Sequence, residues 1–194
     1  LKLLNQSLKV MGLPKVKMKN DNPSNSELYS LSYLNTNTDI SQLLAGLKRN
    51  PDARICLYGP PGTGKTAICK HIANSLKKPL HAHKVSDLMS MYVGQSERNI
   101  ANAFAKAQND GAVLILDEVD SFLRDRNQAS NSWETTLVNE MLTQMESYDG
   151  IFFASTNLMG NLDKAALRRF DLKVEFSYLL PDQAESLADS GLDY

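Results

Sequence analysis

The chain is poor in the residues and runs that mark secreted, membrane and metal-dependent proteins. Its 194 residues include two cysteines, Cys56 and Cys69, which are too few for a disulfide framework or a structural zinc site. No apolar run approaches the roughly 20 residues that a membrane-spanning helix needs, and no signal-peptide pattern is found. We therefore expect a protein of a reducing, cytoplasmic compartment with no membrane segment.

An excess of charge of one sign is also missing, and so are common hydrolase motifs. The formal net charge of −1 gives no global attraction to nucleic acid or to a membrane surface. The chain has no H-E-x-x-H pattern and no nucleophile elbow, which excludes those zinc-protease and serine-hydrolase sites within these residues. His81 and His83 would share one face of a strand. Two ligands are too few for a structural metal, so we interpret both as surface or pocket residues.

What is present is an ordinary globular composition, with 42% hydrophobic and 22% charged residues. Residues 1–38 differ from the rest, because five lysines precede the first acidic residue, Asp21. We predict a short helix at Leu1–Met11 and a linker after it. A solvated tether is the simpler interpretation of the lysines, and a segment that docks on a partner or on nucleic acid is the alternative. Residues 1–38 are therefore assigned to an amino-terminal linker or docking segment.

From Ile40 onward, helical and strand patterns alternate. Continuous apolar runs such as "AVLIL" are typical of strands that are buried on both faces of a parallel sheet. Their alternation with helices predicts an α/β domain, with the sheet between two layers of helices. Ser96 is the predicted N-cap of the third helix. We expect helices at 40–49, 65–76, 96–108, 134–146 and 163–169, and five strands at 54–58, 80–85, 112–116, 151–156 and 172–176.

The stretch "GPPGTGKT" matches the phosphate-loop pattern G-x-x-x-x-G-K-[ST], with a predicted strand before it and a predicted helix after it. Glycines allow a backbone path on which N–H groups surround phosphates, and the helix N-terminus adds its dipole. Lys65 would neutralise phosphate charge, and the Thr66 hydroxyl would bind Mg²⁺. A chance glycine-rich turn is the alternative, which the flanking elements argue against. The predicted nucleotide-binding residues of this loop are Gly59, Pro60, Pro61, Gly62, Thr63, Gly64, Lys65, Thr66 and Ala67.

A second acidic motif, "VLILDEVD", places two carboxylates at the end of a buried strand. In doubly wound sheets, ligands bind at the carboxyl ends of the strands, so both acids are expected to face the phosphate loop. Asp117 would hold Mg²⁺ through water, and Glu118 would act as the general base on the attacking water. A pair of solvated acids that cap the next helix is the alternative. ATP and Mg²⁺ are therefore the predicted substrate and cofactor.

The ordered set of motifs resembles a known family. The stretches "GPPGTGKT", "MYVGQSERNIANAFAKA", "LILDEVDSFLRDR", "VNEMLTQME", "ASTN" and "LDKAALRRFD" are similar, in this order, to the large ATPase domain of the AAA proteins. The resemblance covers residues 39–181. It implies the P-loop NTPase fold, a three-layer α/β/α sandwich with a five-stranded parallel sheet. It also implies assembly into a homo-oligomeric, usually hexameric, ring.

The resemblance implies roles for residues that the chemistry alone leaves open. Asn157 matches the polar sensor residue beside the γ-phosphate, and a carboxamide there can orient the lytic water. Arg168 or Arg169 matches the arginine finger that reaches the nucleotide of the neighbouring subunit. Without the resemblance, Asn157 could simply start a turn, and the arginines could simply decorate a helix C-terminus. The large-domain side of the adenine pocket is expected from Asp39 and Ile40, together with the phosphate loop.

The loop with "MYVG" matches the loop that faces the central pore in this family. On residue type alone, Tyr92 would pack on the next helix. The resemblance implies instead that Tyr92 and Val93 grip an extended polypeptide substrate, for which a large amphipathic ring is suited.

Three departures from the family pattern stand out. Arg169 runs straight into Phe170 without the usual two-residue insert, which puts a two-arginine finger in doubt. Leu158 follows the sensor position, where many members carry arginine. Residues 182–194 are too few for the helical lid and are assigned to the start of a truncated or absent lid region.

The leading hypothesis is a ring-forming ATPase that remodels or unfolds protein substrates by threading them past the pore loop. The alternative is an ATP-dependent switch or loader acting on nucleic acid, supported only by the lysine-rich amino-terminal segment. A nucleotide-binding scaffold that rarely hydrolyses ATP is a third hypothesis, and the presence of Glu118 and Asn157 argues against it.

Overall fold

The computed structural model describes residues 34–92, 94–121 and 132–180. The helix predicted at Leu1–Met11, the linker after it, Val93 and residues 182–194 lie outside the described residues. In the part of the chain that is described, no helix combines the length and the apolar content that crossing a bilayer requires.

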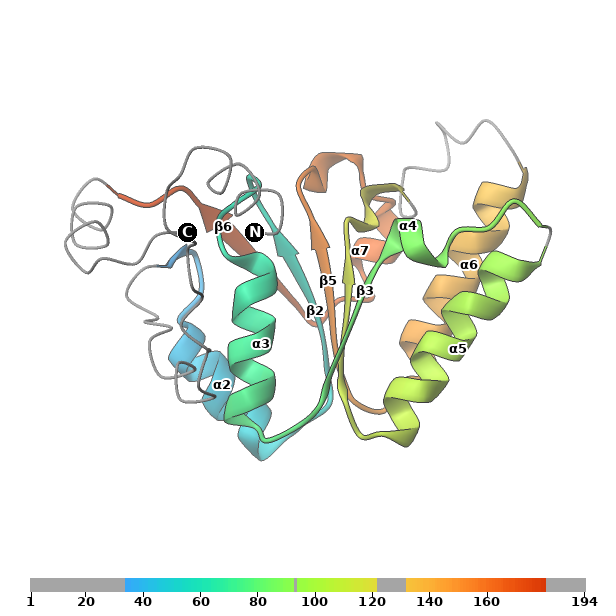
Figure 1. The fold of residues 1–194 in the computed structure, drawn as a ribbon. Coiled ribbons are helices and arrows are strands. Elements are labelled where there is room, and N and C mark those ends of the chain that lie inside the picture. Colours follow the sequence, from blue (N-terminus) through green and yellow to red (C-terminus); the bar gives the residue numbers. More distant parts are fainter. Residues whose placement is uncertain (1–33, 93, 122–131, 181–194) are drawn as a thin grey trace, which may run out of the picture. The chain divides into compact units, whose positions relative to one another are not determined.

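A six-stranded sheet forms the centre of the domain (Figure 1). Five of its strands are parallel neighbours in the order β6-β2-β5-β4-β3, which confirms the α/β class and the five predicted parallel strands. A short strand that was not predicted, β1, pairs antiparallel with β6 at one edge. The strands are β1 (Asn35–Thr36), β2 (Ala53–Tyr58), β3 (Leu80–Lys84), β4 (Val113–Asp117), β5 (Ile151–Thr156) and β6 (Leu172–Ser177).

Strand β1 lies in the segment that the sequence assigned to an amino-terminal linker. It is followed by Asn37, whose backbone N–H donates to the Glu175 carbonyl at 3.2 Å and whose side-chain Oδ1 accepts from the Glu175 N–H at 2.9 Å. Residues 35–37 are therefore tied to β6, and the domain boundary at residue 38 stays a prediction.

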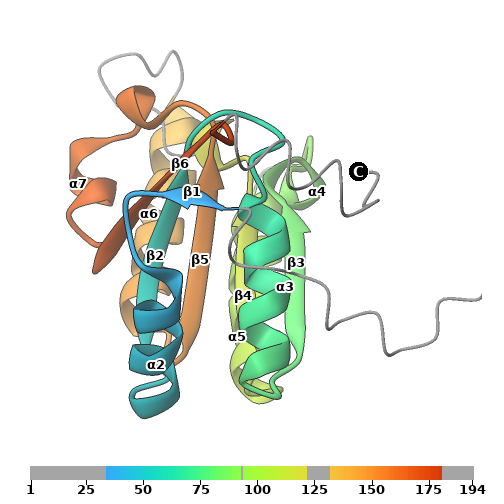
Figure 2. The same ribbon diagram turned by 90° about the vertical axis from the view of Figure 1, so that its left-hand side faces the viewer.

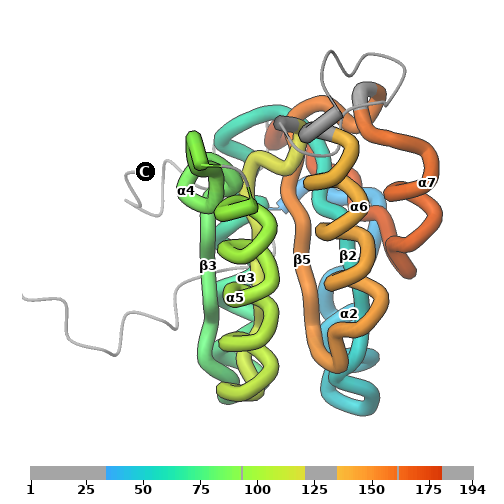
Figure 3. Tube along the Cα trace, turned by 90° about the vertical axis from the view of Figure 1, so that its right-hand side faces the viewer, coloured from blue at the N-terminus to red at the C-terminus, as the bar shows by residue number. Residues whose placement is uncertain are grey.

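Helices cover both faces of the sheet. Helices α2 (Ile40–Arg49) and α3 (Lys65–Ser75) lie on one face (Figure 2). Helices α5 (Gln95–Asn109) and α6 (Ser132–Ser147) lie side by side on the other (Figure 3). Short helical turns complete the chain: α4 (Val85–Leu88), η3 (Val119–Ser121), η5 (Met159–Asn161) and α7 (Lys164–Leu167).

Aromatic side chains join the layer of α5 and α6 to the sheet. Phe104 of α5 packs on Phe152 of β5 with ring centroids 5.2 Å apart, and edge-on against Tyr148 at 5.5 Å. Phe152 in turn stacks on Phe170 at 6.3 Å, so the segment after α7 is anchored in the same core. Each such ring removes a large apolar area from water, and aromatic pairs add roughly 0.5–1.5 kcal/mol beyond that burial.

The N-cap of α5 was predicted wrongly. Gly94, with a φ of 76°, occupies the N-cap position, and Ser96 lies in the first turn of the helix. The Ser96 Oγ is buried and accepts a hydrogen bond from the Ser90 backbone N–H at 2.9 Å. The serine therefore fixes the preceding loop on the helix rather than capping the helix itself.

Both cysteines are free and buried. Burial raises the pKa of the Cys56 thiol to about 12, with a small opposing effect of Lys173. Burial likewise raises the pKa of the Cys69 thiol well above its ordinary value. Because the thiolate is the reactive form, these side chains act as packing residues.

Candidate functional site

The phosphate loop runs from the end of β2 to the start of α3. It uses left-handed backbone at Gly62 and Gly64, with φ of 76° and 91°, and Gly64 is the residue from which α3 begins. The Thr63 hydroxyl donates to the Pro60 carbonyl at 2.9 Å and closes the loop on itself. The loop therefore has the glycine-dependent path that directs backbone N–H groups and a helix N-terminus toward an anion.

Lys65 is the central cation of the site and is only 7% exposed. Its Nζ donates to the carbonyl oxygens of Gly59 at 2.8 Å and Pro60 at 2.7 Å, and to Oδ1 of Asn157 at 3.0 Å. Burial lowers the pKa of the Lys65 ammonium, while the charges of Asp117 and Asp120 oppose that shift. These three acceptors and two carboxylates hold a charged lysine in the loop where a triphosphate would add further negative charge.

Asp117 ends β4 next to the start of α3. Its Oδ2 accepts from the Thr66 hydroxyl at 2.8 Å, and its Oδ1 accepts from the Ser155 hydroxyl and from the Glu118 backbone N–H at 3.1 Å. The parallel register explains the Ser155 contact, because Leu116 pairs with Ala154 and the next residues of both strands are neighbours. Asp117 and Thr66 thus present adjacent oxygen atoms at the carboxyl edge of the sheet.

Glu118 follows directly, with a φ of 61°. A left-handed conformation at a residue other than glycine costs on the order of 1–3 kcal/mol and tends to occur at functional sites. The turn exposes the glutamate, and its Oε1 lies 3.4 Å from Nζ of Lys84 at the end of β3. Glu118 therefore lies beside Asp117, on the open side of the site.

Asn157 follows the end of β5 and is held by Asp120. Oδ1 of Asp120 accepts from the Thr156 hydroxyl at 2.6 Å and from the Asn157 backbone N–H at 3.3 Å. The Asn157 side chain then accepts from Lys65, as described above. The structure therefore forms two hydrogen-bonded groups at this edge of the sheet. One joins Lys65 to Asn157 and Asp120, and the other joins Thr66 to Asp117 and the backbone of Glu118.

These residues fit a nucleotide with a divalent cation. Hydroxyl and carboxylate oxygens are the ligands that Mg²⁺ takes in proteins, and Thr66 and Asp117 supply one of each within hydrogen-bond distance. Lys65 and the loop fit the phosphates.

Asp39 and Ile40 have structural tasks of their own. The Asp39 carboxylate caps α2, accepting from the N–H groups of Ser41 at 2.8 Å and Gln42 at 3.2 Å, and Ile40 is buried. Their role in an adenine pocket stays a prediction.

Arg168 and Arg169 lie at the end of α7 and have different surroundings. Arg169 forms an ion pair with Glu146 of α6, whereas Arg168 is exposed. Their roles at a neighbouring nucleotide stay predictions.

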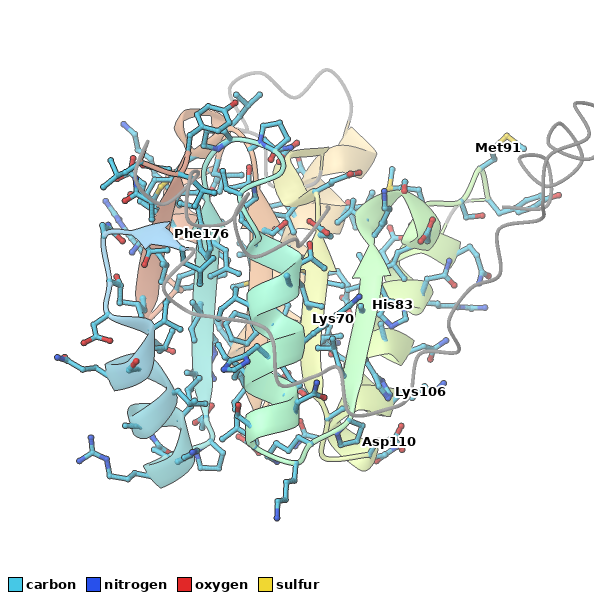
Figure 4. All side chains as sticks on the ribbon, turned by 60° about the vertical axis from the view of Figure 1, so that its left-hand side comes forward. Lys70, His83, Met91, Lys106, Asp110 and Phe176 are labelled. Carbon is cyan, nitrogen blue, oxygen red and sulfur yellow. The ribbon has the colours of Figure 1, made fainter. Side chains whose placement is uncertain are left out.

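The loop before α5 exposes its tip. Met91 is 97% exposed and Tyr92 is 77% exposed, and Figure 4 shows Met91 extending away from the sheet. Hydrogen bonds hold the base of the loop: the Tyr92 N–H donates to Ser90 Oγ at 3.2 Å, and Asn99 Nδ2 donates to the Leu88 carbonyl at 3.0 Å. A cavity of about 290 Å³ lies against this loop, between Met89, Glu97 and Leu137. The Tyr92 side chain is thus mostly exposed, whereas the residue type alone favoured packing on the next helix.

Sequence reasoning missed Asp120, Ser155, Thr156 and Lys84 as members of the site. Ser155 and Thr156 are each 1% exposed in the structure. The signal available in the sequence was a pair of hydroxyl residues at the end of the apolar run in "IFFAST". Asp120 and Lys84 carried no such signal, because their partners lie on other elements.

Comparisons with known proteins agree with this geometry. The family "ATPase family associated with various cellular activities (AAA)" matches residues 55–178. The chain is 38% identical over 138 residues to the ATP-dependent zinc metalloprotease FtsH of Lachnoclostridium phytofermentans, covering 66% of this chain and 24% of that protein. It is 37% identical over 137 residues to the peroxisomal ATPase pex6 of Schizosaccharomyces pombe, covering 65% of this chain and 14% of that protein. It is 34% identical over 139 residues to the vacuolar protein sorting-associated protein 4 of Dictyostelium discoideum, covering 69% of this chain and 31% of that protein.

The chain thus spans less than a third of the length of these relatives. The matched region, in contrast, contains the phosphate loop, Asp117, Glu118 and Asn157 together, and it is more than half of the chain. On this evidence, the chain belongs to the AAA family of ATPases.

Proposed function

We propose that this domain is the motor of a homo-oligomeric ring, most simply a hexamer, that uses ATP hydrolysis to remodel or unfold polypeptides. The observation that carries the proposal is the exposure of Met91 and Tyr92 in the loop before α5, where the Tyr92 N–H is hydrogen-bonded to Ser90. A large thioether and a phenol ring can pack on side chains of many kinds, which suits a clamp without sequence preference. The substrate class proposed is therefore an extended polypeptide.

The chemistry proposed for the site follows from its contacts. Lys65 and the loop of Gly59–Thr66 would hold the phosphates, and Thr66 with Asp117 would hold Mg²⁺, which would supply neutralisation of the phosphate charge. Glu118 accepts a proton from the attacking water, and Asn157 orients that water. Separate hydrogen bonds support the positions of these groups: Asp117 accepts from the Glu118 N–H and the Thr66 hydroxyl, and Asp120 accepts from the Asn157 N–H.

A connection between the site and the exposed loop supports the coupling. Lys84 lies beside Glu118 at the end of β3, and only α4 and a few residues separate Lys84 from Met91. A shift of β3 against β4 would therefore move both the surroundings of Glu118 and the base of the loop.

The nucleic-acid alternative gains no support from this loop, because residues 89–94 contain no lysine or arginine that could bind phosphate. The cytoplasmic location and the ring remain part of the proposal.

Two experiments on the full-length protein test the proposal. ATPase activity per subunit should rise with protein concentration, because the proposed ring supplies an arginine from the neighbouring subunit. Tyr92→Ala should leave ATP binding unchanged and abolish unfolding of a fluorescent test protein, whereas Tyr92→Phe should keep most of it. Unfolding that survives Tyr92→Ala would rule out the clamp.

A further inference from the structure

Arg169 is held inside its own subunit by two acceptors. Its Nε pairs with Oε1 of Glu146 near the end of α6, and its Nη1 donates to the Ala165 carbonyl at 3.0 Å. The side chain is 33% exposed, so the guanidinium lies along the surface of the domain and does not extend from it.

The backbone around Arg169 is also fixed. Phe170 is 4% exposed and stacks on Phe152 of the core. Asp171 exchanges hydrogen bonds with Arg54 of β2: its carboxylate accepts from the Arg54 N–H at 2.8 Å, and its own N–H donates to the Arg54 carbonyl at 2.9 Å.

Arg54 also fixes the end of α6 from which Glu146 extends. Its Nε donates to the Met145 carbonyl at 2.6 Å, next to Glu146 in the chain. The two partners, Glu146 and Arg169, are therefore positioned by the same residue of β2, and their ion pair is set by the fold on both sides.

Arg168 has the opposite surroundings. It is exposed, and among the described residues its guanidinium has no hydrogen-bond or ion-pair partner. Lys164, four residues earlier on α7, is exposed as well, so both cations are on the solvent face of this short helix. Asp163 fixes the start of the helix by accepting from the N–H groups of Ala165 at 2.8 Å and Ala166 at 3.1 Å.

We propose, on the basis of the proposed function, that Arg168 alone contacts the nucleotide of the neighbouring subunit and that Arg169 is a positioning residue. To reach across an interface, the Arg169 guanidinium would have to break its ion pair with Glu146 and its hydrogen bond to the Ala165 carbonyl. The Arg168 guanidinium would lose only contacts with water. The Glu146–Arg169 pair holds the end of α7 so that Arg168 projects from it. The two consecutive arginines of "RRF" thus have different roles: Arg168 contacts the neighbouring nucleotide, and Arg169 holds Arg168 in position.

The test compares variants of the full-length protein at concentrations where parental ATPase activity per subunit has reached its plateau. Arg168→Ala should lower kcat by about 10³-fold or more, as removal of an arginine supplied in trans does, and should leave ATP binding unchanged. Lys164→Ala is the matched control from the same face and should stay within about twofold of the parent, as expected for an exposed charge outside the site.

The positioning role of the Glu146–Arg169 ion pair is tested by exchanging the charges of the two residues. Arg169→Ala and Glu146→Ala should each lower kcat roughly fivefold, the effect expected for a partly exposed ion pair. The double variant Glu146→Arg with Arg169→Glu should recover most of that loss, because the pair is restored with the charges reversed. A double variant no more active than Arg169→Ala, or a loss in Arg169→Ala as large as that in Arg168→Ala, would overturn the proposal, because a restored ion pair would then not replace the guanidinium at residue 169.

A mixing experiment separates a role in trans from a local folding defect. Arg168→Ala subunits keep an intact site, and Glu118→Gln subunits keep an intact Arg168, so rings mixed from both should regain activity that neither shows alone. Absence of any gain, or near-parental kcat in Arg168→Ala, overturns the assignment. Parental activity that never rises with concentration would instead refute the ring on which the assignment rests.

Discussion

Nζ of Lys65 donates a hydrogen bond to Oδ1 of Asn157 at 3.0 Å, joining the start of α3 to the end of β5. The same ammonium also donates to two carbonyl groups of the phosphate loop. A lysine that shares its protons among these acceptors must redistribute them when a triphosphate arrives. Asn157 is therefore coupled directly to the group that binds the phosphates.

This relationship predicts the effect of removing the carboxamide. Asn157→Ala should lower kcat for ATP hydrolysis by about 10²-fold, the lower end of what loss of one positioned polar group costs. ATP affinity should change little, because Lys65 keeps both loop carbonyls and its charge. Steady-state kinetics and nucleotide titration measure the two effects separately. Leu158→Ala, at the exposed neighbouring residue, is the control, and an equal loss of affinity and of kcat would contradict the prediction.

Asp120 fixes the backbone of Asn157 by a hydrogen bond. Its Oδ1 accepts from both the Thr156 hydroxyl and the Asn157 N–H. Asp120→Ala leaves the buried Thr156 hydroxyl without this partner and should lower the free energy of unfolding by about 1–3 kcal/mol. It should also lower kcat, whereas Asp120→Asn keeps an acceptor oxygen and should do both to a smaller extent. Urea titration and ATPase assays on the parent, Asp120→Ala and Asp120→Asn measure both effects. A parental kcat in Asp120→Ala would show that Asn157 does not need its hydrogen bond to Asp120.

Gly59 has a packing role that differs from those of the other loop glycines. A Cβ built on Gly59 would lie 2.0 Å from the Phe176 carbonyl oxygen of β6, and the φ of this residue is 137°. Gly62 also has a positive φ, but nothing lies within 4 Å of its Cβ position. Gly62→Ala should therefore cost about 1–2 kcal/mol of stability, the penalty of left-handed backbone alone. Gly59→Ala should cost more than about 3 kcal/mol, since backbone must move. Equal midpoints in urea unfolding would refute the distinction.

The phosphate loop, Asp117 and Glu118 could be predicted because their chemistry is local, whereas Asn157 was predicted only through the resemblance to a family. Each lies at the end of a strand that its own apolar run identifies, and parallel strands bring those ends to one edge. Strand β1 could not be found this way, since two residues have no periodicity and their partner lies at Phe176 and Ser177.

Most of the remaining misses share one physical cause, which is that the partner lies far away in the sequence. Asp120 acquires its role only through Thr156, 36 residues later. The difference between Arg168 and Arg169 depends on Glu146, which belongs to another helix. The N-cap of α5 has a different cause, because it depends on local backbone: Gly94 takes a left-handed conformation there, and the nearby Ser90 N–H uses the Ser96 hydroxyl.

His83 lies on β3 (Figure 4). Its imidazole makes the stability of the protein depend on pH in a defined direction. Burial is the main cause that lowers the pKa of its imidazole from 6.5, and the charges of His81 and Lys106 add to it, while Asp87 opposes it. The unfolded chain therefore binds a proton at this residue at a higher pH than the folded chain does. As the pH falls below about 6.5, protonation favours the unfolded state, and the free energy of unfolding decreases until the folded pKa is passed.

Replacing the imidazole should remove this part of the pH dependence. His83→Gln and the parent should differ in unfolding free energy by a constant amount above pH 7.5, where the imidazole is neutral in both states. Below pH 6.5 the difference should shift in favour of the variant, because only the parent gains a proton at residue 83 on unfolding. Urea unfolding at pH 8, 7, 6 and 5 measures the shift, and the carboxylates common to both proteins cancel in the comparison. Parallel loss of stability in the two proteins from pH 8 to pH 5 would show that His83 titrates alike in the folded and unfolded chains.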